Sequence, residues 1–220
     1  MTGPGQAERP GRAERPRPAE LAAVVCAGML HIATELFFSE TLARGYNVVA
    51  TLGFLVYLLR RGRAVPGITR AWGMRGDNFW PALRAQMGFG LVGAVALLSY
   101  GLIADSIDLP WSFWMTAALY PAWGIAQQFA LQNLIARNLA DRFHRPPALA
   151  AVAAVVFSLA HFPRVDLMVL TLVAGFFFTA TYRRRPNLWA VGIVHGLLGS
   201  LAVYIVLGED PGAALWEMFF

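Results

Sequence analysis

Lysine is absent from this chain of 220 residues, and charged residues of any kind are scarce. They make up 14% of the sequence, whereas hydrophobic residues make up 57%, and the mean hydropathy is +0.52. This balance excludes an ordinary soluble domain and predicts an integral membrane protein embedded in a lipid bilayer. Cysteine is almost absent as well, since Cys26 stands alone, and this excludes a disulfide within the chain.

The missing lysine leaves arginine as the source of all 18 basic side chains and of an isoelectric point near 10. Most of these arginines lie in short loops beside apolar stretches, a placement that sets membrane topology. We therefore expect no nucleic-acid partner. Exclusive use of arginine is typical of a GC-rich genome, which favours a bacterial inner (plasma) membrane as the location.

Seven apolar stretches are candidates for helices that cross the bilayer, which takes about 17–25 residues each. Arginines cluster in the loops after the second, fourth and sixth stretches, and the alternate loops are acidic or neutral. The positive-inside rule then predicts a cytoplasmic N-terminus and an external C-terminus. We expect a polytopic all-α bundle with spans at Leu21–Phe38, Tyr46–Leu59, Ala85–Ala104, Phe113–Leu139, Ala148–Phe162, Asp166–Tyr182 and Leu188–Leu207.

The N-terminal segment has a different composition from the rest of the chain. Residues 1–19 are rich in proline, glycine and paired charges, and the sequence Ala-Glu-Arg-Pro occurs at 7–10 and again at 13–16. A segment with so little apolar bulk cannot bury a core. We expect a disordered cytoplasmic tail there, followed by an integral membrane domain at residues 20–220.

Strongly polar side chains interrupt the predicted spans at a similar depth. A helical rise of about 1.5 Å per residue puts Gln127, His161 and His195 in the middle third of the membrane. Glu35 of the first span falls at a similar level. Ionisable groups at membrane depth are costly and usually mark a site or a pathway. These depths allow the side chains to meet.

Three motifs carry these residues, and their key positions are four apart, or nearly so, which puts them on one helical face. The motifs are Gln127-Gln128-x-x-x-Gln132, Phe157-x-x-x-His161 and His195-x-x-x-Gly199. In order and spacing they resemble the CPBP family of intramembrane endopeptidases, which includes the CAAX endopeptidases and the bacteriocin-processing and immunity (ABI) proteins. That family's pattern is Glu-Glu-x-x-x-Arg, Phe-x-x-x-His and His-x-x-x-Asn or Asp on successive core helices.

The resemblance covers residues 111–207 and implies a CPBP-like four-helix core on the last four spans. The stretch Trp72-Gly73-Met74-Arg75 is also similar to a Gly-Leu-Arg-like segment of the family. The implied activity is cleavage of a lipidated or membrane-anchored protein near the bilayer. In the family, the first glutamate and the second motif's histidine are thought to activate water, and the third motif is thought to stabilise the oxyanion.

The chain departs from this pattern where the family has its charged groups. Gln127 and Gln128 stand in the glutamate positions, Gln132 in the arginine position and Gly199 in the final Asn or Asp position. An amide cannot take a proton from water at ordinary pH. We therefore expect His161 to act as the base and His195 to donate to the oxyanion. Gln127 or Gln128 is then the candidate partner that fixes the tautomer of His161.

Glu35 offers another source of a carboxylate. It lies four residues after His31, so the two share a helical face. If the first span packs against the core, Glu35 is able to join the site. The alternative is a satisfied His31–Glu35 pair with a purely structural role.

Structural roles and other functions stay open at this stage. The glutamines are able to form hydrogen bonds between helices, and the repeat Gly192-x-x-x-Gly196 permits close helix packing around His195. A catalytically lapsed homologue would bind membrane peptides without cutting, and a small proton-coupled transporter would use Glu35 and the histidines. No His-Glu-x-x-His helix is present, so we expect no metal and no other cofactor, although His161, His195 and Glu35 would make a two-histidine, one-carboxylate set.

Overall fold

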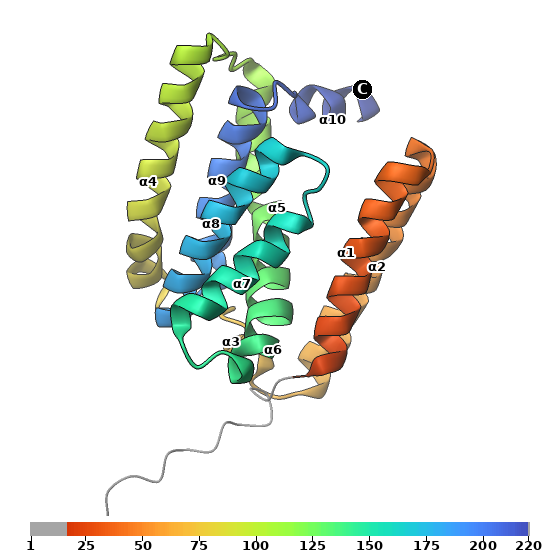
Figure 1. The fold of residues 1–220 in the computed structure, drawn as a ribbon, viewed down its shortest axis with the longest axis vertical. Coiled ribbons are helices and arrows are strands. Elements are labelled where there is room, and N and C mark those ends of the chain that lie inside the picture. Colours follow the sequence, from red (N-terminus) through yellow and green to blue (C-terminus); the bar gives the residue numbers. More distant parts are fainter. Residues whose placement is uncertain (1–16, 220) are drawn as a thin grey trace, which may run out of the picture.

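The computed structural model describes residues 17–219, and all regular structure in that range is helical (Figure 1). This confirms the predicted all-α membrane fold. The elements are α1 (Pro18–Phe37), α2 (Glu40–Ala64), α3 (Ile68–Ala71), α4 (Phe79–Ala104), α5 (Trp111–Phe129), η1 (Ala130–Ala136), α6 (Arg137–Leu139), η2 (Ala140–Arg142), α7 (Pro146–Leu159), α8 (Val165–Arg184), α9 (Leu188–Ile205) and α10 (Pro211–Phe219).

Most of the predicted disordered tail lies outside the described residues, which begin at position 17. The end of that tail was placed slightly too far along the chain, because α1 already begins at Pro18. Proline is well suited to this first position, since its fixed backbone angle matches the helix and its missing N–H has no helical partner there.

By length and composition, five of the described helices are able to cross a membrane, namely α1, α2, α4, α8 and α9. The other two predicted spans have a different form. The fourth is the composite helix α5–η1–α6, whose middle is wound as a π-helix. The fifth is α7, an apolar helix of 14 residues that ends at Leu159, short of the predicted end at Phe162. Pro163 disfavours helical geometry at the residue before it, which accounts for the early end.

The helices α1 and α2 form an antiparallel pair beside the rest of the bundle (Figure 1). One half of this pair packs on the core, through Leu21 and Val24 of α1 and Phe54 and Tyr57 of α2. The other half exposes large apolar side chains, including Phe37. Exposed apolar surface of this kind suits contact with lipid tails.

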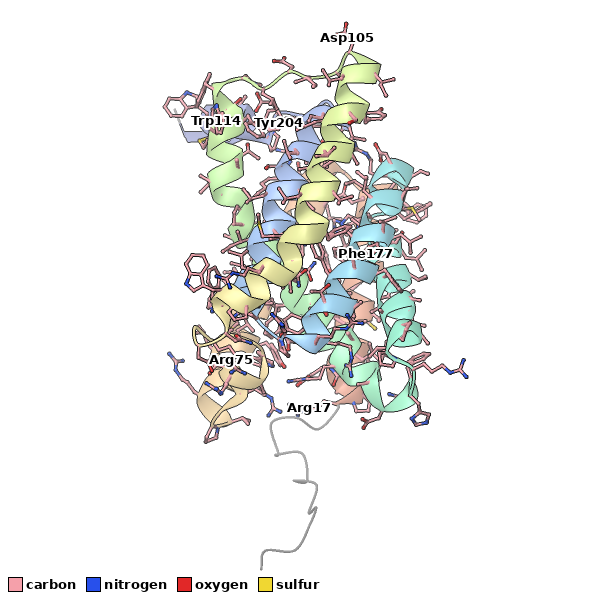
Figure 2. All side chains as sticks on the ribbon, turned by 90° about the vertical axis from the view of Figure 1, so that its left-hand side faces the viewer. Arg17, Arg75, Asp105, Trp114, Phe177 and Tyr204 are labelled. Carbon is pink, nitrogen blue, oxygen red and sulfur yellow. The ribbon has the colours of Figure 1, made fainter. Side chains whose placement is uncertain are left out.

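The core is centred on α9, which packs against α5, α4 and α8, while α7 packs against α8. Figure 2 shows Arg17 and Arg75 at one end of the molecule and Asp105, Trp114 and Tyr204 at the other. This separation agrees with the alternation of arginine-rich and acidic loops. Which end faces the cytoplasm stays a prediction.

Candidate active site

Glycines bring α5 and α9 into backbone contact at the centre of the bundle. Gly124 of α5 faces Gly192 and Gly196 of α9, and a Cβ on Gly124 would lie 2.7 Å from the Gly196 nitrogen. Such a distance leaves no room for any side chain, so only glycine permits this approach. The close packing suggested by the Gly192-x-x-x-Gly196 repeat is therefore present. Gln128 lies one helical turn after Gly124 on α5. The close approach of α5 and α9 therefore places Gln128 against His195.

Gln128 and His195 are joined by a hydrogen bond of 2.9 Å between Gln128 Nε2 and His195 Nδ1. An amide nitrogen can only donate, so Nδ1 accepts and the neutral ring carries its proton on Nε2. Aromatic rings hold the imidazole in place. It stacks on Phe178, with centroids 5.4 Å apart, and meets the Phe157 ring edge to face at 5.8 Å.

Gln132 completes a buried chain of amides behind His195. It lies in the π-helical segment η1, and π-helical turns occur frequently at functional sites. Its Nε2 atom donates to Gln128 Oε1 at 2.9 Å and to Thr179 Oγ1 of α8 at 3.2 Å. The position that is arginine in the related family thus carries a neutral donor, which suits a site lined by apolar helices.

His161 lies in the turn that follows α7. Its Nδ1 atom is 2.8 Å from the carbonyl oxygen of Phe157, which can only accept a hydrogen bond. The proton of the neutral ring is therefore on Nδ1, and Nε2 keeps its lone pair. The prediction that Gln127 or Gln128 fixes the tautomer of His161 is corrected here, because the backbone of Phe157 has that role.

Phe157 is a shared neighbour of the two histidines. The Phe157 ring contacts the His161 ring at a centroid distance of 4.9 Å as well as the His195 ring. Both imidazoles are partly exposed, whereas Gln128 and Gln132 are buried. The site thus has an accessible layer of histidines and a buried layer of amides that supports one of them.

Gln127 precedes Gln128 on α5, and its side chain is half-buried. Within residues 17–219, it makes no hydrogen bond to another side chain or to the backbone through its amide. Gln127 is thus free to bind a water molecule or a polar group of a ligand. Gln128, by contrast, uses both ends of its amide on protein partners.

Glu35 is exposed on α1 and forms no ion pair within the described part of the chain. Its expected partner His31 instead binds Asn47 of α2, with 3.0 Å between His31 Nδ1 and Asn47 Oδ1. No group of three His, Cys, Asp or Glu side chains in residues 17–219 is placed to hold a metal ion. The set of His161, His195 and Glu35 considered from the sequence is therefore not assembled.

Gly199, at the last motif position, lies beside the ring of Tyr120. A Cβ on Gly199 would be 3.4 Å from Tyr120 Cδ1. An aromatic ring of α5 thus adjoins the space where the related family has an Asn or Asp side chain. The third motif consequently contributes a histidine and close packing, and no second polar group.

The stretch around Trp72 packs against the helices that carry Gln128 and Thr179. The buried Trp72 ring packs edge to face on Phe129, which follows Gln128, at 4.9 Å. The Trp72 carbonyl accepts hydrogen bonds from Asn133 at 3.2 Å and from Tyr182 at 2.9 Å. These bonds tie the loop to the π-helical segment and to α8.

Comparison with protein families gave a match within the core of the chain. The family described as type II CAAX prenyl endopeptidase, Rce1-like, matches residues 109–201. The match confirms the predicted resemblance to the CPBP family over this segment. Its limits nearly coincide with the core expected at residues 111–207, and the Rce1-like segment contains all three motifs. Neither the curated proteins nor the solved structures gave a match to this chain.

Two supporting residues of the Rce1-like segment were not identified from the sequence. Neither Thr179 nor Phe178 was singled out by the motifs. A polar residue in an otherwise apolar span is the one signal that points to Thr179. Nothing local to Phe178 indicates that its ring stacks on His195.

Proposed function

We propose that this protein is an intramembrane endopeptidase of CPBP type, in which two histidines replace the usual glutamate-based activation of water. The observation that carries the proposal is the complementary protonation of the two rings. His161 Nε2 keeps a lone pair, because Nδ1 donates to the Phe157 carbonyl. His195 Nε2 carries a proton, because Nδ1 accepts from Gln128.

This pair supplies a base and a donor for peptide hydrolysis. His161 Nε2 takes a proton from water as the water oxygen attacks the scissile carbonyl carbon. His195 Nε2–H donates to the developing oxyanion, which it stabilises without having to gain or lose a proton. The His161 imidazolium then gives its proton to the leaving amine as the C–N bond breaks. The products are a new carboxyl terminus and a free amine, and both histidines regain their starting state.

The substrate class follows from where the site lies. The two partly exposed histidines lie among apolar helices of a membrane protein, so we expect a substrate to reach them from the bilayer or its surface. A lipidated or membrane-anchored protein meets this requirement. Gln127 suits a role in orienting the attacking water, since its amide makes no bond within the described residues.

A second function is favoured by one specific observation. The Gln128 amide donates to His195 and accepts from Gln132, so both of its ends are already bonded. Neither Gln128 nor Gln127 is able to accept a proton from water. A lapsed homologue with these features would bind membrane peptides and leave them intact. The two proposals make opposite predictions for cleavage.

The test compares protein termini in membranes from cells that express the native protein or its variants. New termini that occur with the native protein and disappear in His161→Ala are the expected result. His144→Ala is the matched control, because His144 is exposed in a loop outside the site. Identical termini in native protein and His161→Ala, at equal protein levels, would overturn the protease and leave the binding function.

A further inference from the structure

Thr179 and Gln132 are buried beneath the partly exposed histidines, and neither is able to touch a substrate. Thr179 has no exposed surface, and Gln132 is 2% exposed. Both hydrogens of the Gln132 amide nitrogen are engaged, one by Gln128 Oε1 and one by Thr179 Oγ1. The Gln132 oxygen is buried without a hydrogen-bond partner in the described residues. A buried acceptor left open is costly, so this arrangement calls for an explanation.

The direction of the hydrogen bonds between these side chains supplies an explanation. Because each amide nitrogen donates and each amide oxygen accepts, the bonds run one way, from Gln132 to Gln128 and from Gln128 to His195. The Gln128 amide cannot turn over without losing its bond from Gln132. As long as Thr179 holds the Gln132 nitrogen in place, His195 Nδ1 faces a donor and has to remain unprotonated.

The same series of hydrogen bonds disfavours protonation of His195 to the charged imidazolium. An imidazolium carries N–H groups on both nitrogens, and its Nδ1–H would point at the Gln128 N–H. Two donors that face each other in a buried site leave both unsatisfied. Relief requires that both amides rotate, so that the Gln128 oxygen accepts from Nδ1–H and the Gln132 oxygen accepts from Gln128. The Thr179 hydroxyl would then have to donate where it now accepts.

We propose that Thr179 and Gln132 are positioning residues that hold His195 as the neutral tautomer with its proton on Nε2. The geometry behind this is the relay from Thr179 through Gln132 and Gln128 to the ring, a path that joins α8, the π-helical segment, α5 and α9. Its consequence for catalysis rests on the proposed function, because Nε2–H is the group assigned to the oxyanion. The tautomer itself is measurable without any substrate.

The experiment is nitrogen NMR of the full chain in lipid nanodiscs, with histidine ring nitrogens labelled and His195 assigned from the signals lost in His195→Ala. The native protein is expected to show a protonated Nε2 and an unprotonated Nδ1 at His195. Thr179→Val keeps the shape of the side chain and removes its acceptor, so the Gln132 amide is released. We expect both His195 tautomers to become populated to comparable extents, and Thr179→Ser to restore the native pattern. Gln132→Leu is expected to act like Thr179→Val.

His161 is the internal control, because its tautomer is set by the Phe157 carbonyl outside the relay. A native His195 signal in both Thr179→Val and Gln132→Leu would overturn the proposal. Changes of equal size at His161 that Thr179→Ser did not reverse would overturn it too, since they would indicate general loss of packing. A tautomer that responds as expected in a protein that cuts nothing would sustain the relay and remove the protease.

Discussion

Two buried polar clusters lie along the same composite helix, α5–η1–α6, and they differ in charge. The amide–histidine cluster contains Gln128, Gln132, Thr179 and His195 and is neutral throughout. The arginine–glutamate cluster surrounds Glu20 at the far end of that helix. Glu20 contacts Arg17 at 3.3 Å, Arg137 at 3.2 Å, Asn138 at 3.2 Å and Arg61 at 3.7 Å.

The difference follows from depth in the bundle. The arginine–glutamate cluster lies at the end that carries Arg17 (Figure 2), where the clustered arginines predict contact with head groups and water. There, charged side chains tie α1 and α2 to α6 at a tolerable desolvation cost. The amide–histidine cluster lies farther along the composite helix, among apolar spans. The free-energy cost of a charged side chain is largest at such depth. In this cluster, neutral amide hydrogen bonds fix the position of the histidine proton instead.

Removal of Glu20 is expected to have the largest effect on stability. Glu20→Ala leaves the partly buried Arg61 and Arg137 without a counter-charge, and breaking a buried pair costs about 3–5 kcal/mol, so we expect a loss toward the lower end of that range. The measurement is the free energy of unfolding in mixed micelles. Glu209→Ala is the control, because its pair with Arg164 is exposed and is worth at most about 1 kcal/mol. Equal losses in both variants would contradict the structural importance of the arginine–glutamate cluster.

A smaller loss is expected when the packing behind the neutral cluster is disturbed. A Cβ on Gly196 would lie 2.5 Å from Pro121 Cα, so Gly196→Ala forces α5 and α9 apart. We expect a cost of about 1–3 kcal/mol and loss of the Gln128 bond to His195. Gly28→Ala is the matched control, since a Cβ there meets nothing within 4 Å. It should leave stability unchanged or raise it slightly. A native His195 tautomer in Gly196→Ala, measured by nitrogen NMR, would contradict the link between packing and site.

A new negative charge at Gln127, the residue before the buried Gln128, is expected to change the rate of cleavage. Gln127→Glu adds a carboxylate at a half-buried position, where water is able to solvate it. We expect cleavage to become at least about tenfold faster, because a carboxylate is able to assist proton removal. Gln128→Glu is the counterpart at a fully buried position and is expected to be the less stable of the two variants. A slower Gln127→Glu protein in a reporter cleavage assay would argue against a water-activating role at this position.

The smallest effect is expected at the opposite end of the bundle, at Asp210. Its carboxylate accepts hydrogen bonds from Ser112 at 2.6 Å, Tyr204 at 2.5 Å and the Ala213 backbone at 2.8 Å. Partial burial raises the pKa of Asp210, but these bonds outweigh it, and the net pKa lies below the ordinary aspartate value. The contribution of Asp210 is therefore present above that ordinary value and is lost as the pH falls through the lowered pKa.

The measurement is hydrogen exchange of the segment that joins α9 to α10 as the pH is lowered. Protection from exchange, taken relative to the intrinsic exchange rate at each pH, should decrease toward acid pH in the native protein, and Asp210→Asn should already be less protected at neutral pH. Glu209→Gln, one residue earlier, is the control and should resemble the native protein. An Asp210→Asn protein with native exchange at neutral pH would remove this role.

The fold was largely predictable because its signals are local. Long apolar stretches and arginine-rich loops predicted an all-α membrane protein, and five of the predicted spans are helices able to cross a membrane. The errors arose where local signals compete with other forces. The apolar run at residues 148–162 continues past the point at which α7 ends. Hydropathy also carries no sign of the π-helical winding at Ala130–Ala136.

The sequence suggested members for the candidate site, but it could not predict the bonds between them. Motif order singled out Gln127, Gln128, His161 and His195, and the match over residues 109–201 contains all four positions. Glu35 was included because spacing along one helix shows which residues share a face. Spacing does not show what that face packs against, and the structure leaves Glu35 exposed.

Taken by itself, the sequence determined the membrane environment, the helical class and the family resemblance, because hydropathy and motif spacing are properties of short segments. Only the tertiary structure decided where the protons of the two histidines lie. Those positions depend on partners far apart in the chain, such as Gln128 with His195 across 67 residues and Gln132 with Thr179 across 47. Such pairs are formed when glycine contacts bring α5 and α9 together and α8 closes behind them, and no local pattern encodes that arrangement.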